Sequence, residues 1–409
     1  MRSTFLRATA AVLGLALLAT ACGDDGAESS AATSTSTTTV AAISTTTEST
    51  TTTTVGPEPL RLNDLQVLGS HNSYHQRPEP DVYTAIELVS QELAESIDYS
   101  HRTLTEQLDE FGVRQFEIDV FADPDGGLYA SRAALPVVGQ PAESGLPELD
   151  EPGFKVLHTQ DFDFGTNCLT LQLCLGEIAA WSDANPDHLP LMIMIELKEE
   201  SVPDAAAASG LELPDLGIAW TQPIPTDVAV LDALDAELVA AMGSERIIRP
   251  DDVRGEQFTL EEAVLADGWP TVDESRGKVM FAMVNGGDAH DLYRVDRPSL
   301  EGRVMFTTST PGEPDAAFLR IDDPIAGAAD IARRAAEGYL IRTRTDTPTV
   351  DARTGDETRR DAAIGSGAHF LSTDYYAEDP GFDTGYVVEV PPLCNPVTAP
   401  PGCVLELVG

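Results

Sequence analysis

The chain is poor in basic residues. Its 409 residues include 25 lysines and arginines against 68 aspartates and glutamates, and the formal net charge is -43 at pH 7. Nucleic-acid binding depends on a basic surface that neutralises phosphates, so this imbalance excludes a nucleic-acid partner. It also disfavours nonspecific adhesion to anionic lipid, because like charges repel. The charge by itself indicates solubility and does not indicate a metal site.

Cysteines are also few, and their spacing does not suit zinc. The chain has five cysteines, with no CxxC pair and no histidine beside either local pair. A structural zinc site needs closely spaced ligands, so a zinc module is disfavoured. An exported chain favours disulfides, and the two local pairs are the simplest of the pairings open to four cysteines: Cys168 with Cys174, and Cys394 with Cys403. The sequence also lacks an internal repeat and a GxGxxG dinucleotide loop.

The first part of the chain has the pattern of an export signal. Residues 1–21 carry Arg2 and Arg7, followed by the apolar run AAVLGLALLATA. This run is shorter than the ~20 apolar residues of a spanning helix, which favours a lipoprotein signal peptide over an uncleaved anchor. Cys22 follows ATA directly and is the expected site of a lipid, which predicts a cell-envelope lipoprotein on the outer side of the membrane. Residues 22–59 are mostly Ser, Thr, Ala, Val and Gly, and are expected to form a disordered linker.

Residues 60–409 have the pattern of one α/β domain. Short apolar runs rich in β-branched residues alternate with amphipathic or irregular stretches. This alternation indicates parallel strands covered by helices, and so many units in about 350 residues favour a TIM-like (β/α)8 barrel, with distortion allowed, over an open sheet. Strands are expected at 65–69, 114–120, 155–158, 190–197, 246–248, 278–284, 303–307, 339–344 and 369–375. Helices are expected at 103–111, 171–184, 227–242 and 324–338.

Polar side chains stand at the ends of four of these runs. The runs LQVLGSHN, VRQFEID, FKVLH and LMIMIE end in His71 and Asn72, Glu117 and Asp119, His158, and Glu196. Active sites of barrels lie at the carboxyl ends of the strands. Glu117 and Asp119 share one face of a strand, and two crowded carboxylates need a cation or a proton between them. Oxygen ligands suit a hard cation such as Ca²⁺ or Mg²⁺, and histidines suit acid–base work near neutral pH.

Together these motifs resemble the phosphatidylinositol-specific phospholipase C superfamily. LNDLQVLGSHNSYH and the late STDYY are similar to its calcium-dependent bacterial branch. The resemblance implies a TIM-like barrel in which His71 takes the proton of the inositol 2-hydroxyl and His158 stabilises the phosphorane and assists protonation. The calcium-independent branch uses a basic residue in place of the metal, and the acids of this chain match the metal-dependent pattern. The resemblance further implies one Ca²⁺ ion held by Asn72, Glu117, Asp119 and Glu196.

Residues beyond these motifs give weaker signals. Lys198, Arg342 and Arg344 are candidates for contact with the phosphate or the inositol hydroxyls, with a salt-bridged barrel rim as the alternative. Tyr375 is a candidate for stacking on the inositol ring, with ordinary packing as the alternative. The remaining histidines have no partner pattern and are expected to be structural or at the surface: His75, His101, His188, His290 and His369.

The expected function is therefore that of an exported, lipid-anchored, Ca²⁺-dependent phosphodiesterase. Its substrate would be a phosphatidylinositol-type lipid, its products diacylglycerol and a cyclic inositol phosphate, and no protein partner is implied. One alternative is a glycerophosphodiester phosphodiesterase or a sphingomyelinase-D-like enzyme, which the long interval from Asp119 to His158 disfavours. The other alternative is a non-catalytic lipoprotein that binds a ligand on a degenerate barrel, for which replacement of His71 or His158 would change nothing.

Overall fold

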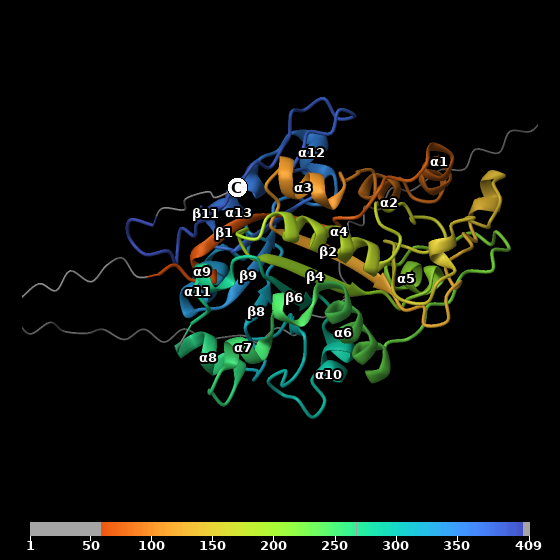
Figure 1. Ribbon diagram of the computed structural model, residues 1–409. Helices are drawn as coiled ribbons and strands as arrows, with labels where there is room; N and C mark the ends of the chain where they lie inside the picture. The colour runs from red at the N-terminus through yellow and green to blue at the C-terminus, as the bar shows by residue number, and fades with distance from the viewer. Residues whose placement is uncertain (1–58, 267, 404–409) are drawn as a thin grey trace, which may run out of the picture.

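A ring of parallel strands surrounded by helices forms the centre of the computed structural model, which describes residues 59–266 and 268–403 (Figure 1). Neighbouring strands pair in parallel from β6 through β4, β2, β1, β10 and β9 to β8, and β7 pairs with β6. The ring closes between β7 and β8 through the Thr308–Phe318 bridge, where Ser309 N donates to Phe318 O at 3.2 Å. The expected TIM-like barrel is confirmed. Its strands are β1 (Leu65–Ser70), β2 (Gln115–Phe121), β4 (Leu191–Leu197), β6 (Val279–Met283), β7 (Met305–Thr307), β8 (Phe318–Arg320), β9 (Leu340–Arg344) and β10 (Phe370–Thr373).

Three short strands differ from the expected set. The run at 155–158 forms only β3 (Lys155–Val156), which pairs antiparallel with β2 outside the ring. The run at 246–248 forms only β5 (Ile247–Ile248), which pairs with the start of β6. One strand of the ring, β8, was not expected. It has only three residues, ending in Arg320, and so short a strand shows no periodic pattern in the sequence. A further strand, β11 (Leu393–Cys394), pairs antiparallel with β1.

The expected helices are present: the helix at 171–184 has the expected bounds, and the other three are shorter at one or both ends. They are α3 (Leu104–Glu110), α4 (Leu171–Ala184), α6 (Val228–Met242) and α11 (Ala328–Glu337). Helix α6 shows why such ends form: the side chain of Asp227 accepts from Val230 N at 2.8 Å, and the helix stops at Gly243, whose φ is 79°. The other helices are α1 (Pro80–Val89), α2 (Gln91–Ser96), α5 (Val202–Ala208), α7 (Pro250–Arg254), α8 (Leu260–Ala266), α9 (Val272–Ser275), α10 (Gly287–Tyr293), α12 (Val350–Thr354) and α13 (Thr358–Gly365).

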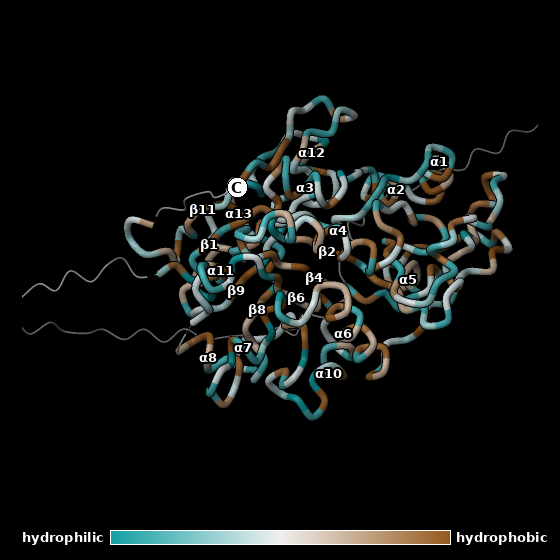
Figure 2. The backbone as a smooth tube through the Cα atoms, in the orientation of Figure 1, coloured by the Kyte–Doolittle hydropathy of each residue, from teal (hydrophilic) through white to brown (hydrophobic). Residues whose placement is uncertain are grey.

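The strands supply the core. Strand β4, with sequence LMIMIEL, is buried along its length except at Glu196, and β2 is buried throughout. Figure 2 shows the hydrophobic colour gathered along the central strands, while hydrophilic segments lie mostly on the outer loops and helices. Each fully buried Leu, Ile or Met side chain contributes about 1.5–3 kcal/mol of transfer free energy. Close packing also explains Gly69, because a Cβ there would lie 2.0 Å from the Gln115 side-chain oxygen on β2.

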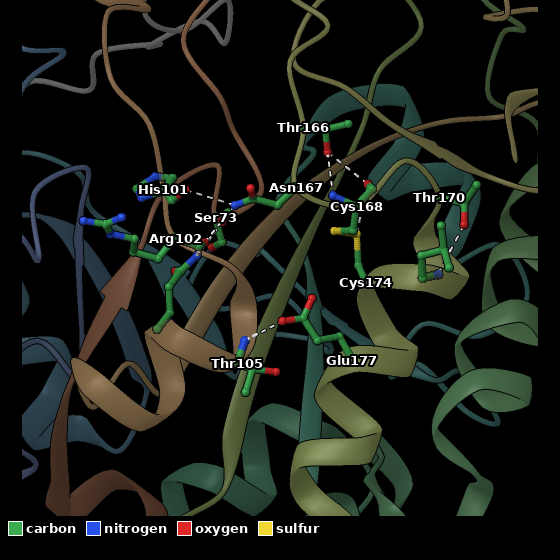
Figure 3. Close-up of a disulfide and its surroundings, with 12 residues drawn as sticks. Ser73, His101, Arg102, Thr105, Thr166, Asn167, Cys168, Thr170, Cys174 and Glu177 are labelled. Carbon is green, nitrogen blue, oxygen red and sulfur yellow. Dashed lines mark hydrogen bonds between the residues drawn. A yellow bond between two sulfur atoms is a disulfide. The ribbon is translucent and has the colours of Figure 1, made fainter. Parts of the chain in front are cut away.

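Two disulfides fix segments next to the ring. Both expected local pairings are confirmed, with Cα–Cα distances of 5.3 Å for Cys168–Cys174 and 6.1 Å for Cys394–Cys403. Beside the first, the Asn167 side chain donates to the carbonyls of His101 and Arg102 at 3.1 and 2.8 Å (Figure 3). The segment before α4 is thereby fastened to the segment before α3, and both segments border the carboxyl ends of β1 and β2.

The expected organisation begins with a signal peptide at 1–21 and a linker at 22–59. The expected signal peptide, Cys22 and nearly all of the expected linker lie outside the described residues. Within the part of the chain that is described, no helix combines the length and the apolar character needed to cross a membrane.

Candidate active site

The predicted acids lie inside the barrel, toward the carboxyl ends of β2 and β4. Asp119 pairs in register with Glu196 on the neighbouring strand, and Glu117 precedes Asp119 on the same face of β2. Glu117 and Asp119 are 2% and 0% exposed, so neither is a surface carboxylate. In Figure 1, β2 and β4 run toward the side of the molecule where α2 and α5 lie, which is therefore the side of the candidate site. The interior position predicted for this acid pair is what the structure shows.

Lys198 lies between two of these acids. Its Nζ is 3.1 Å from Asp119 Oδ2 and 3.0 Å from Glu196 Oε1. Burial alone would lower the pKa of Lys198, but the two carboxylates outweigh it and the pKa is raised. For Glu196 burial opposes the shift, and Lys198 outweighs it and lowers the pKa. Burial is the dominant influence on Asp119 and raises its pKa well above the usual range. A single ammonium group thus balances two adjacent carboxylates.

Arginines of β9 pair with the other acids of the site. Arg342 Nη2 donates to Glu117 Oε2 at 2.6 Å, and its second Nη group contacts Asp322. Arg344 Nη2 lies 2.7 Å from Asp374 Oδ2, and burial of Arg344 is outweighed by nearby carboxylates so that its pKa is raised. From the sequence, these arginines were predicted either to contact the substrate or to form salt bridges at the rim of the barrel. The structure shows both of them ion-paired within the site.

His71 is held by the residue that follows the last strand of the ring. Its Nδ1 is 2.9 Å from Asp374 Oδ1, and its backbone N donates to Thr373 O at 3.0 Å. Its Nε2 is directed toward Glu117, with a distance of 4.0 Å to Oε1. Burial first, and then the positive charge of Arg344, lower the pKa of His71 well below 6.5. The imidazole is therefore neutral at neutral pH, with one nitrogen oriented by a carboxylate.

His158 is held by a second carboxylate. Its Nδ1 is 2.6 Å from Asp163 Oδ2, and Asp163 Oδ1 is 3.0 Å from Nε2 of His75. Burial would raise the pKa of Asp163, but the charge of His75 and the hydrogen bonds from both histidines outweigh it and lower the pKa. His75 in turn contacts Tyr99 O at 3.2 Å through Nδ1. In both His71 and His158, Nδ1 faces an aspartate, and Nε2 makes no hydrogen bond to a residue that the structure describes.

Asn72 sits at the sharp turn after β1. Its φ of 44° is left-handed, which asparagine tolerates better than most residues. Its Nδ2 donates to the Tyr99 hydroxyl at 3.1 Å, which leaves the side-chain carbonyl as its remaining polar group. The next residue fixes the turn to β2, because Ser73 N donates to Glu117 O and Ser73 Oγ accepts from Glu117 N, both at 2.8 Å.

The predicted metal ligands share a chemistry that suits a hard cation. Three carboxylates and one amide carbonyl provide only oxygen atoms. Neither oxygen of buried Asp119 has a hydrogen-bond partner among the described residues, and Oδ2 is ion-paired with Lys198 at 3.1 Å. The ligand atoms of Glu117, Asp119 and Glu196 do not all lie within 4.8 Å of one another. Arg342 is paired with Glu117, and Lys198 is paired with the other two acids. Among the described residues, one group of acids and histidines has its ligand atoms within 4.8 Å, namely His75, His158 and Asp163.

Some residues considered from sequence lie apart from this arrangement. Tyr375 is 2% exposed and its ring packs 5.9 and 6.0 Å from those of Phe382 and Tyr386, so its contact with a substrate stays a prediction. The five histidines expected to be structural or at the surface are all buried: His75, His101, His188, His290 and His369. Of these, His75 does belong to the site, through its contact with Asp163.

Sequence reasoning missed two site carboxylates and the role of His75. One sequence signal marked Asp374, since it lies near the carboxyl end of the predicted run at 369–375 and directly follows β10. Asp163 and His75 lie in irregular segments, where no periodicity marks a partner.

Comparison with known proteins agrees with this chemistry. The sequence profile of the family described as "Phosphoinositide phospholipase C, Ca2+-dependent" matches residues 60–399. No curated protein matches the chain.

Among solved structures, the chain is similar to a calcium-dependent phosphoinositol-specific phospholipase C of Pseudomonas sp. at 14% identity, covering 80% of this chain and 96% of that one with a TM-score of 0.47. It is similar to the Ca²⁺-dependent enzyme of Streptomyces antibioticus at 18% identity, covering 78% and 95% with a TM-score of 0.46. It is similar to the phosphatidylinositol-specific phospholipase C of Listeria monocytogenes at 11% identity, covering 78% of this chain and 90% of that one with a TM-score of 0.41. From the family profile, which spans almost all of the described residues, the chain belongs to the Ca²⁺-dependent phosphoinositide phospholipase C family and is a phosphodiesterase that acts on phosphoinositides.

Proposed function

We propose that the enzyme cleaves phosphatidylinositol-type lipids to diacylglycerol and a cyclic inositol phosphate by acid–base catalysis with His71 and His158. The observation that carries this proposal is the pair of His–Asp contacts at one end of the barrel. Each ring is oriented through Nδ1 by a buried aspartate, Asp374 or Asp163, at 2.9 and 2.6 Å. An imidazole oriented in this way presents Nε2 for proton transfer.

In this proposal His71 accepts the proton of the attacking inositol hydroxyl at Nε2. Its lowered pKa supports the base role, because a base must start unprotonated. His158 is assigned the stabilisation of the phosphorane and the delivery of a proton to the departing oxygen of diacylglycerol. Asp163 supports that role, because its carboxylate stabilises an imidazolium at His158. The Arg342 and Arg344 guanidiniums and Lys198 supply positive charge beside the phosphate and the inositol hydroxyls.

The calcium ligands in this proposal are Asn72, Glu117, Asp119 and Glu196. The ion, when bound, supplies positive potential to the phosphodiester and lowers the pKa of a coordinated hydroxyl. The all-oxygen donor set and the burial of Asp119 between β2 and β4 support this assignment. For the location of the enzyme, we propose export by residues 1–21 and attachment through a lipid on Cys22, which would hold the barrel near its lipid substrate on the outer side of the membrane.

The reaction is tested by following products with ³¹P NMR. Purified enzyme with micelles of phosphatidylinositol and millimolar Ca²⁺ is expected to form a cyclic phosphodiester signal, and a chelator is expected to abolish it. Glycerophosphocholine in parallel samples is expected to remain intact, which separates this reaction from the glycerophosphodiester alternative. Failure to form a cyclic phosphodiester from any inositol lipid in the presence of calcium would overturn the proposed reaction.

The pKa of His71 sets an expected pH dependence. A base with a lowered pKa is protonated, and inactive, only below that pKa. The acid limb of kcat/KM is therefore expected to lie below pH 6.5, the ordinary value for histidine, and activity is expected to stay constant from there to neutral pH. The measurement is kcat/KM on a soluble inositol phosphodiester at fixed free Ca²⁺ between pH 4.5 and 8. An acid limb at or above pH 6.5 would remove His71 from the base role.

A further inference from the structure

The position of Lys198 points to a role before the substrate arrives. We propose that the ammonium group of Lys198 is an internal competitor of Ca²⁺, which occupies the space between Asp119 and Glu196 and must leave before both carboxylates can bind the ion. The inference rests on the ligand assignment proposed above. It assigns Lys198 a function in metal loading, in addition to the predicted contact with substrate.

The contacts of Lys198 show how it competes. Its Nζ reaches Asp119 Oδ2 at 3.1 Å and Glu196 Oε1 at 3.0 Å, and both carboxylates stand in register on adjacent strands. Its backbone N donates to Val120 O at 2.9 Å, so the side chain is tethered at the carboxyl end of the same two strands. One ammonium group therefore occupies the same two acids that the proposed metal site requires.

The Lys198 side chain is exposed enough to move into the solvent. The side chain of Lys198 is 24% exposed and that of Glu196 is 29% exposed, whereas that of Asp119 is fully buried. The flexible stem of lysine allows the ammonium group to swing toward the solvent without moving the strands. Once released, it carries positive charge at the entrance of the site, where a phosphate would arrive. Metal loading and phosphate binding would then strengthen each other, because both require Lys198 to leave its two partners.

The chain contains a matched control lysine. It has three lysines in all: Lys155, Lys198 and Lys278. Lys155 is ion-paired like Lys198, with Nζ 3.0 Å from Asp123 Oδ2, and its side chain is fully buried. Its other contacts are backbone carbonyls, those of Glu151 and Gly153 at 2.6 and 3.1 Å. Loss of Lys155 therefore disturbs a buried ion pair of the same kind without releasing a proposed calcium ligand.

The first test measures Ca²⁺ binding without substrate. Isothermal titration of wild type, Lys198→Met and Lys155→Met is done at one fixed pH. Lys198→Met is expected to bind Ca²⁺ at least about tenfold more tightly than wild type, because its ligands are no longer shared with an ammonium group. Lys155→Met is expected to keep the wild-type affinity. Lys198→Met that binds Ca²⁺ no more tightly than wild type overturns the inference.

The second test uses the wild-type protein and does not depend on the stability of a variant. An amine-selective reagent is applied with Ca²⁺ or with chelator, and the modified lysines are quantified by mass spectrometry. Modification of Lys198 is expected to rise several-fold with Ca²⁺, while that of half-buried Lys278 is expected to stay the same. Equal reactivity of Lys198 in both samples contradicts its displacement.

These outcomes are separable from those of the proposed reaction. Neither test contains an inositol lipid, so both report on Lys198 and the metal alone. A tighter Ca²⁺ affinity of Lys198→Met together with no cyclic product from wild type would retain the competition and reject the reaction. Cyclic product from wild type with unchanged affinity in the variant would do the opposite.

Discussion

Replacing His71 by alanine is expected to lower kcat by about a hundredfold to ten-thousandfold, the range typical of a lost general base. The physical reason is that no other described side chain combines a neutral imidazole with orientation by Asp374, whose Oδ1 lies 2.9 Å from His71 Nδ1. The loss is expected in kcat more than in KM, because the proton transfer takes place in the transition state. Steady-state kinetics on phosphatidylinositol micelles, with a Ca²⁺ titration of the same variant to show intact metal binding, provide the measurement.

The matched control for this variant is His188→Ala. His188 is also buried, and its Nε2 contacts Ser182 Oγ at 2.8 Å, but it precedes β4 and so lies at the opposite end of the barrel. This control is expected to lower stability and to leave kcat of the folded fraction unchanged. Asp374→Asn is expected to give a smaller loss than His71→Ala together with a shifted acid limb of kcat/KM. A His71→Ala enzyme with wild-type kcat would support the non-catalytic binding barrel instead.

Removing calcium is expected to lower activity about a thousandfold or more, and readdition is expected to restore it. Electrostatic stabilisation of a developing charge by a metal is worth several kcal/mol, which corresponds to this range. The family to which the chain belongs is Ca²⁺-dependent, and the proposed ligands include two buried carboxylates, Glu117 and Asp119. The measurement is initial rate against free Ca²⁺ set by a chelator buffer, with Mg²⁺ as the competing hard cation.

Variants locate the ion within the barrel. Glu196→Gln is expected to raise the Ca²⁺ concentration for half-maximal activity, because it removes one charged ligand. Glu237→Gln is the control. The Glu237 side chain on α6 is half-buried like that of Glu196, but its carboxylate accepts from the backbone N of Phe154 at 3.3 Å and is not a proposed calcium ligand. Full activity in the presence of excess chelator, or an unchanged calcium requirement in Glu196→Gln, would contradict the assigned site.

The regular part of this fold was predictable because strands with long apolar runs carry a strong local signal. The run LMIMIEL became β4, and the i, i+2 spacing correctly placed Glu117 and Asp119 on one interior face. Strand β8 was missed because three residues are too few to show a period. The run FKVLH was assigned to the ring, but it forms a two-residue strand paired antiparallel with β2, so His158 reaches the site from a loop.

The network around the site was less predictable than the site residues themselves. Pairings such as Asp374 with His71 and Arg342 with Glu117 join residues more than 200 positions apart, and no local pattern encodes them. The placement of Lys198 between two acids depends on the register of β2 and β4, which only the folded sheet defines. The positions of charged residues were readable from the sequence, whereas the choice of partners was decided by tertiary packing.

The closure of the ring has a consequence for how the enzyme matures. Because β10 lies beside β1, the aspartate that orients His71 comes from near the carboxyl end of the chain. A chain shortened before residue 340 would keep both histidines and every proposed calcium ligand, yet would lack Arg342, Arg344 and Asp374. The orientation of His71 by Asp374 therefore forms only once β10 has paired with β1.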